Sequence, residues 1–151
     1  MFKNIITILI VFSFAQSYSQ DINWVTLDQA IELQKKAPRN IIMDVYTNWC
    51  GPCKLLDRNT FKNKDVSAFI NKHFYAVKFN AEGNSNVNYD GNVFTNPNFD
   101  PAKTQRRNGT HELARYLNVS AYPTIIFMDK NSKLITFVRG YKTPKQIELW
   151  L

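Results

Sequence analysis

The feature that most constrains the fold of this 151-residue chain is an apolar segment, Asn40–Tyr46, which runs almost directly into the paired cysteines. Because the apolar run is too continuous for a half-exposed strand, we predict a central parallel strand with both faces covered. The next segment is predicted to be helical to about Asn59, since Pro52 in a first helical turn has no N–H that needs a partner. Cys50 and Cys53 are therefore expected at a strand-to-helix junction.

Cys50 and Cys53 are the only cysteines in the sequence. The unpaired N–H groups at a helix start favour a thiolate, so we expect the pKa of Cys50 to lie below that of a free thiol. Cys53, one helical turn later, can attack the mixed disulfide that Cys50 forms and release the product. The pair predicts a two-electron thiol–disulfide switch that uses no cofactor other than its own disulfide.

Three other uses of the cysteine pair remain as alternatives. A structural disulfide is one, although so short a loop removes little chain entropy. A zinc site would need two more ligands, and the only histidines, His73 and His111, lack finger-like spacing. A copper site meets the same objection. We therefore predict that the cysteine pair is redox-active and that it binds no metal.

The hexapeptide Trp49-Cys50-Gly51-Pro52-Cys53-Lys54 resembles the active-site motif of the thioredoxin family. Further residues at the expected places extend the resemblance over residues 41–140: Asp44, Lys78, Tyr122-Pro123-Thr124 and Gly140. The resemblance implies an α/β thioredoxin fold, in which helices flank a central mixed β-sheet.

The resemblance also implies roles for two charged residues. Asp44 would accept the proton of Cys53 during exchange, with Lys78 as its electrostatic neighbour, and a buried carboxylate there should have a raised pKa. The alternative is an aspartate that faces solvent near the end of a strand.

A substrate groove beside the cysteines follows from the same resemblance. Trp49, Gly51 and Pro52 would form one side, although Trp49 could simply be a packed aromatic residue. Pro123 would be cis and lie beside the disulfide, preceded by Tyr122; the alternative is an ordinary trans turn proline. Gly140 would allow close approach beside the active site.

The N-terminus has the proportions of a signal peptide over residues 1–19, with Lys3 before the apolar run Ile5–Phe14 and cleavage expected before Gln20. A buried N-terminal strand or a retained anchor are the alternatives. Export implies a periplasmic or secreted protein, and a reducing protein there would need electrons from a membrane-bound donor. Residues 20–151 are then one thioredoxin-like domain by length.

The formal charge of +7 does not by itself indicate nucleic-acid binding. Lysine and arginine are spread along the chain, apart from Arg106-Arg107, which favours an ordinary solvated basic surface. We expect client proteins with disulfides as partners and no nucleic acid. We also expect a monomer, because no dimerisation segment is evident.

Residues 81–108 are the main departure from the family pattern. They contain seven asparagines and no clear periodicity, whereas small thioredoxins cross this region in a few residues. We expect this insertion to form a wall or lid over the groove, anchored by Tyr89, Phe94 and Phe99. The alternative is a solvated surface excursion.

The remaining elements are predicted from periodicity and turn residues. Helices are expected over 27–36, 64–72, 111–117 (capped by Thr110, with His111 exposed) and 144–151; strands are expected over 74–80, 124–128 and 134–138.

These patterns together predict an exported thiol:disulfide oxidoreductase that reduces protein disulfides through Cys50 and Cys53. A disulfide oxidase or isomerase is the alternative within this class. A non-catalytic thioredoxin-like module that binds clients is the alternative from another class.

Overall fold

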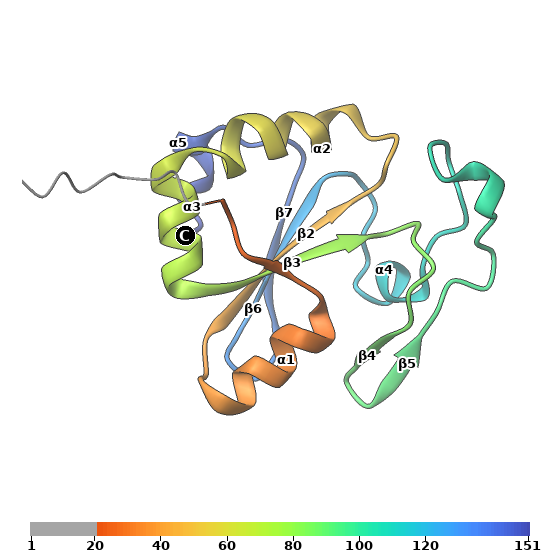
Figure 1. The fold of residues 1–151 in the computed structure, drawn as a ribbon, viewed down its shortest axis with the longest axis horizontal. Helices are drawn as coiled ribbons and strands as arrows, with labels where there is room; N and C mark the ends of the chain where they lie inside the picture. The colour runs from red at the N-terminus through yellow and green to blue at the C-terminus, as the bar shows by residue number, and fades with distance from the viewer. Residues whose placement is uncertain (1–20) are drawn as a thin grey trace, which may run out of the picture.

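The computed structural model of the protein describes residues 21–151, and the predicted signal peptide lies outside the described residues. Five strands form the main sheet in the order β1-β3-β2-β6-β7 (Figure 1). Their bounds are β1 Trp24–Val25, β2 Asn40–Tyr46, β3 Phe74–Asn80, β6 Thr124–Met128 and β7 Leu134–Arg139.

The sheet is mixed. β3 runs parallel to both β1 and β2, whereas β6 is antiparallel to β2 and β7 is antiparallel to β6. Because β2 and β3 are parallel and in register from Asn40 opposite Phe74 to Tyr46 opposite Asn80, they end at the same edge of the sheet. Segments that follow these two strands are thereby brought together.

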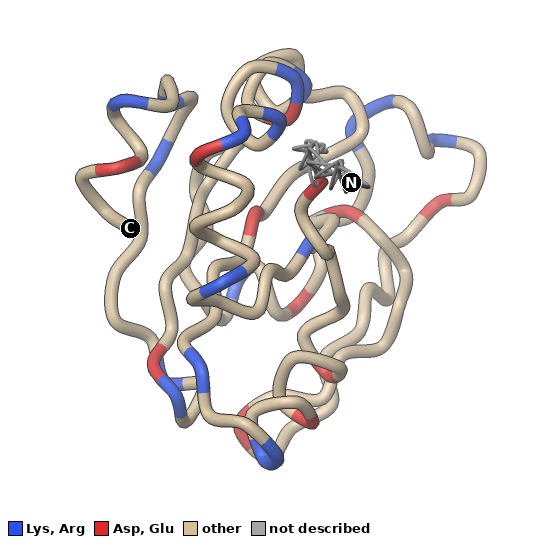
Figure 2. The backbone as a smooth tube through the Cα atoms, turned by 60° about the vertical axis from the view of Figure 1, so that its left-hand side comes forward, with Lys and Arg blue, Asp and Glu red and all other residues tan. Residues whose placement is uncertain are grey.

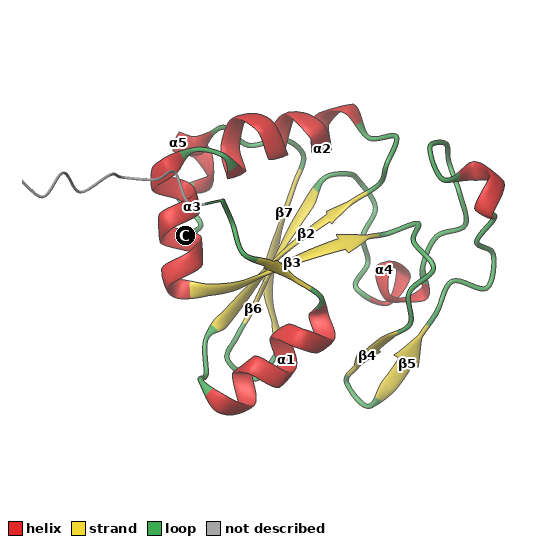
Figure 3. Ribbon diagram, in the orientation of Figure 1, coloured by secondary structure: helices red, strands yellow, loops and turns green. Residues whose placement is uncertain are grey.

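Helices cover both faces of the sheet (Figure 3). One face carries α2 (Gly51–Leu55), the π-helical turn η1 (Leu56–Phe61), α3 (Lys64–His73) and α5 (Pro144–Ile147). The other carries α1 (Leu27–Lys36) and α4 (Glu112–Tyr116). Side chains alternate along the central strands, so that Ile42 and Ile125 enter the core under α3 while Ile41 and Ile126 enter the core under α1.

The insertion is ordered and contains regular structure that the sequence analysis did not predict. β4 (Val87–Tyr89) and β5 (Asn92–Phe94) form a separate two-stranded hairpin, and a short 3₁₀ helix, η2, covers Pro101–Lys103. Val87 and Tyr89 are buried in the core under α1. The insertion is therefore partly a structural element of the domain (Figure 1).

Four predicted elements, α1, β2, β3 and β6, are confirmed with the expected bounds. Other predictions are wrong in detail. The helix after the cysteines continues to Phe61, and the last helix ends at Ile147, not at Leu151. α4 begins at Glu112 and is capped by His111, not by Thr110.

Charged residues occur around the whole molecule, with lysine and arginine interspersed with aspartate and glutamate (Figure 2). Within residues 21–151, no helix combines the length and the apolar composition that crossing a membrane requires.

Candidate active site

Cys50 lies at the junction between β2 and α2 and is the N-cap residue of α2. It forms a disulfide with Cys53 across a Cα–Cα distance of 5.3 Å. The Cys50 Sγ also accepts a hydrogen bond from the Cys53 backbone N–H at 3.2 Å. Only 3% of Cys50 and 2% of Cys53 is exposed, so a client disulfide can reach Cys50 only through close contact with the surrounding surface.

The predicted groove residues come together from separate parts of the chain. The Trp49 and Tyr122 rings meet edge to face, with centroids 6.0 Å apart. The Tyr122–Pro123 peptide bond is cis. Gly140, at a positive φ of 76°, donates its backbone N–H to the Pro123 carbonyl at 2.8 Å. Gly51 and Pro52 are exposed on the helix side.

Asp44 is completely buried, which excludes the solvent-facing alternative. Its Oδ2 accepts a hydrogen bond from the Lys78 Nζ at 2.5 Å, while its Oδ1 has no partner among the described residues. Burial raises the pKa of Asp44 to about 6, and the nearby Lys78 ammonium only partly opposes that rise. Asp44 can therefore change its protonation state near neutral pH.

Lys78 is held by more groups than the sequence analysis predicted. It also forms an ion pair with Asp57 of η1. Its Nζ lies 4.9 Å from the Trp24 ring centroid, 5.0 Å from that of Tyr46 and 5.7 Å from that of Phe61. Burial lowers the pKa of Lys78, but the two carboxylates outweigh burial and leave that pKa above its usual value. The ammonium is thus fixed by carboxylates and aromatic faces.

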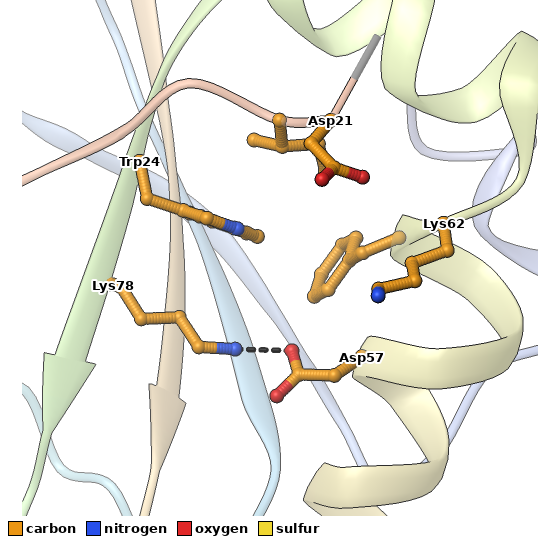
Figure 4. Close-up of a pocket in the computed structure, with 7 residues that line it drawn as sticks. Asp21, Trp24, Asp57, Lys62 and Lys78 are labelled. Atoms are coloured by element: carbon orange, nitrogen blue, oxygen red, sulfur yellow. Dashed lines mark hydrogen bonds and ion pairs between the residues drawn. The ribbon is translucent and has the colours of Figure 1, made fainter. Parts of the chain in front are cut away.

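A cavity of about 380 Å³ opens beside this lysine. Trp24, Asp57 and Lys78 converge on the cavity from β1, η1 and β3 (Figure 4). Asp57 is partly exposed there, whereas Asp44 is not exposed at all. The ion-pair chain from Asp57 through Lys78 therefore connects a solvent-accessible cavity with the buried Asp44 carboxylate.

The insertion contacts the groove directly at Trp49. The Trp49 Nε1 donates to Glu82 Oε2 at 2.7 Å, and the same oxygen accepts the Asn108 backbone N–H at 3.0 Å. Arg107 lies over the Trp49 ring, with its Cζ 4.8 Å from the centroid. The insertion therefore lies against Trp49, and Glu82, which the sequence analysis did not single out, holds the contact.

His111, predicted to be exposed, is instead fully buried. Its Nδ1 accepts the Leu113 backbone N–H at 3.1 Å, and its Nε2 lies 2.8 Å from the Ser85 carbonyl oxygen. This arrangement fixes a tautomer in which Nε2 donates to Ser85. His111 therefore joins the start of the insertion to α4. Nowhere in residues 21–151 do three or more potential metal-ligand side chains of His, Cys, Asp or Glu cluster.

Residues 27–151 match the family model described as a thioredoxin-like domain. The chain belongs to this family. The matched region includes both cysteines, the Asp44–Lys78 ion pair and the groove residues.

Two curated proteins, whose names describe different activities, are similar in sequence to this thioredoxin-like chain. The thiol:disulfide interchange protein DsbD of Actinobacillus pleuropneumoniae is 25% identical over 126 residues, which cover 80% of this chain and 18% of that protein. The peptide-N(4)-(N-acetyl-beta-glucosaminyl)asparagine amidase of Caenorhabditis elegans is 31% identical over 104 residues, which cover 69% of this chain and 12% of that protein. The chain thus spans less than a fifth of the length of these relatives.

A solved structure shows the fold of the thioredoxin-like domain. A thioredoxin from Thermus thermophilus matches with a TM-score of 0.62 and 14% identity, covering 87% of this chain and 85% of that chain. The predicted thioredoxin fold, with a central mixed sheet flanked by helices, is confirmed.

Proposed function

We propose that this thioredoxin-like chain is an exported thiol:disulfide oxidoreductase that reduces disulfides in client proteins. The observation that carries the proposal is the position of Cys50: it caps a helix, accepts the Cys53 N–H, and is disulfide-bonded to Cys53. A thiolate at this position is stabilised by the helix N-terminus. The name of the DsbD relative, a thiol:disulfide interchange protein, supports the same chemistry.

In the proposed reaction, the Cys50 thiolate attacks a sulfur of the client disulfide. A mixed disulfide forms and the other client sulfur leaves as a thiolate. Cys53 then loses its proton to the Asp44 carboxylate and attacks the Cys50 Sγ, which releases the second client thiol and leaves the Cys50–Cys53 disulfide. Lys78 would set the proton affinity of Asp44 through their ion pair.

The groove would hold the client next to Cys50. Trp49, Gly51 and Pro52 would contact it from the helix side, and Tyr122, Pro123 and Gly140 from the sheet side. A backbone edge beside Pro123 suits an extended client segment. Each cycle leaves the enzyme oxidised, so we further propose that a membrane-bound donor returns two electrons to Cys50 and Cys53.

Trapping tests the roles of the two cysteines. Cys53→Ser should accumulate mixed disulfides between Cys50 and clients, because the second attack is removed. The matched variant Cys50→Ser should trap nothing, although it carries the same replacement. Trapping by Cys50→Ser, or by neither variant, would contradict the assigned roles.

Turnover and redox potential test the activity and its direction. The purified protein should reduce insulin catalytically with a small dithiol as electron source. The potential of the cysteine pair should lie on the reducing side of its compartment. An oxidising potential would indicate an oxidase or isomerase. Stoichiometric client binding without turnover would indicate a binding module, which the burial of Cys50 would suit.

A further inference from the structure

Positively charged residues of three separate segments lie next to residues of the candidate groove, in the sequence or in space. Four of them form what we call the basic rim: Lys54, Arg106, Arg107 and Lys142. Lys54 follows Cys53 in α2 and is exposed, as are the two arginines of the insertion. Lys142 lies two residues after Gly140, whose backbone N–H binds the Pro123 carbonyl.

The arginine side of the rim is held in place. Asn48 Nδ2 donates to the Thr104 carbonyl at 2.7 Å, and Glu82 joins Trp49 to the Asn108 N–H. The arginines lie between these two attachment points, and the Arg107 guanidinium rests over the Trp49 ring. The charge of Arg107 is therefore presented at Trp49, and the segment that carries both arginines is attached at its two ends.

The segment that carries Lys142 is also held in place through its backbone. The Thr60 Oγ1 donates to the Lys142 carbonyl at 2.5 Å, which ties this segment to η1. The Lys142 Nζ donates to the Arg139 carbonyl at 2.6 Å. The Lys142 ammonium thus lies near Gly140, the residue that binds the Pro123 carbonyl, while Arg107 lies over Trp49.

Few carboxylates neutralise the rim. Within residues 21–151, none of the four rim residues forms an ion pair with aspartate or glutamate. Asp100 of the insertion is paired with Lys103 at 3.2 Å, and the positive charge of Arg106 also helps to lower the pKa of Asp100. Glu82 is only 9% exposed, and its Oε2 is occupied by Trp49 and Asn108. Asp100 therefore offsets part of the charge of Arg106, whereas the Glu82 carboxylate is occupied by groups next to Trp49.

We infer that the basic rim selects client segments in which the target disulfide is flanked by aspartate or glutamate. This inference rests on the proposed function and adds the class of substrate. Complementary charge at the edge of a binding site mainly accelerates association and makes it sensitive to salt. Acidic client segments would therefore reach Cys50 faster than neutral or basic ones.

Three disulfide peptides of equal length test the inference, with flanking residues that are acidic (Asp/Glu), neutral (Ser/Gln) or basic (Lys/Arg). The measured quantity is kcat/KM for reduction by the full protein, at low and at high salt. We expect the acidic peptide to exceed the basic one by about tenfold or more at low salt and the difference to shrink as salt screens the rim.

Charge reversal supplies the matched comparison. Lys54→Glu with Arg106→Glu should abolish or invert the preference for the acidic peptide. The control variant combines Lys36→Glu with Lys72→Glu and changes the net charge by the same amount. Its two residues lie in α1 and α3, just before β2 and β3 begin, and therefore at the edge of the sheet far from Cys50. This control should keep the preference.

Each outcome decides the inference. Equal rates for the three peptides, or equal losses in the rim variant and the control, would overturn the basic rim while leaving the oxidoreductase intact. Failure to reduce even the neutral peptide would overturn both the rim and the proposed function.

Discussion

At Asp44, burial opposes ionisation more strongly than the Lys78 ammonium favours it. The pKa of this carboxyl rises from 3.8 to about 6, so its ionised form is less stable in the folded protein than in the unfolded chain. The free energy of unfolding that Asp44 contributes therefore falls as the pH rises from about 4 through about 6. Most of this destabilisation is present at neutral pH.

Asp44→Asn should remove this pH dependence. A pKa difference of this size corresponds to about 3 kcal/mol, so the variant should gain up to about that much over the wild type between pH 4 and pH 8. Chemical denaturation at pH 4, 6 and 8 measures the difference. The variant should also release mixed disulfides more slowly. Parallel stability curves together with unchanged exchange rates would contradict both roles of Asp44.

Lys78→Met should raise the pKa of Asp44 further, because the cation that favours its ionised form is lost. The rising limb of the pH–rate profile for protein disulfide reduction should then move to higher pH. Lys62→Met is the matched control, since Lys62 lines the same cavity but forms no ion pair among residues 21–151. A profile that moves equally in both variants would exclude a specific effect of Lys78.

The sequence predicted Asp44 and Lys78 because both lie in strands whose pattern is plain and whose positions match the family. Asp57, Trp24 and Glu82 were missed, since their importance arises from contacts between elements that are distant in sequence. His111 was misplaced for a similar reason: a polar residue near a helix start is usually exposed, but here Ser85 supplies a buried partner.

Among the elements, the hairpin in the insertion is the largest difference from the sequence-based prediction. The sequence did indicate a hairpin turn within Tyr89-Asp90-Gly91-Asn92, because Asp-Gly favours a two-residue turn in which both φ angles are positive. The structure has φ of 49° at Asp90 and 75° at Gly91. The many asparagines obscured the short strands on either side. Four of the five strands of the main sheet were predicted well because their apolar runs are longer, whereas the two-residue strand β1 was not predicted.

Tyr89→Ala should destabilise the whole domain and not only the insertion. The Tyr89 ring is buried in the core under α1, and its hydroxyl donates to the Ser132 carbonyl at 2.8 Å. Loss of a buried aromatic side chain should lower the free energy of unfolding by about 3–5 kcal/mol. Val93→Ala is the control in the same hairpin, because Val93 is 61% exposed and should cost little. Similar effects of the two variants would show that the hairpin is not part of the core.

For the whole molecule, one sheet connects two apolar cores. β2 and β6 send alternate side chains into both cores. If these strands leave the sheet, both cores lose side chains at the same time. The domain should therefore unfold in a single cooperative step.

Ile70→Ala and Leu113→Ala place one cavity in each core. Each should lower the free energy of unfolding by about 2–5 kcal/mol, and both should leave the transition single. Far-ultraviolet circular dichroism and tryptophan fluorescence of the oxidised protein provide two independent measures. Separate midpoints for the two signals in either variant would contradict the shared sheet as the basis of cooperativity.

The insertion leaves and rejoins the domain at one point. The His111 N–H donates to the Ala81 carbonyl at 2.8 Å, and Asn96 Nδ2 donates to the carbonyls of both Gly83 and Gly109. Since the two ends are already joined, a stretch of different length between them would add little to the entropy of loop closure. The part of the insertion beyond the hairpin can therefore be replaced by a segment of another sequence or length without disturbing the sheet or the cysteines. Such a replacement would change the residues that meet the client, and with them the client specificity.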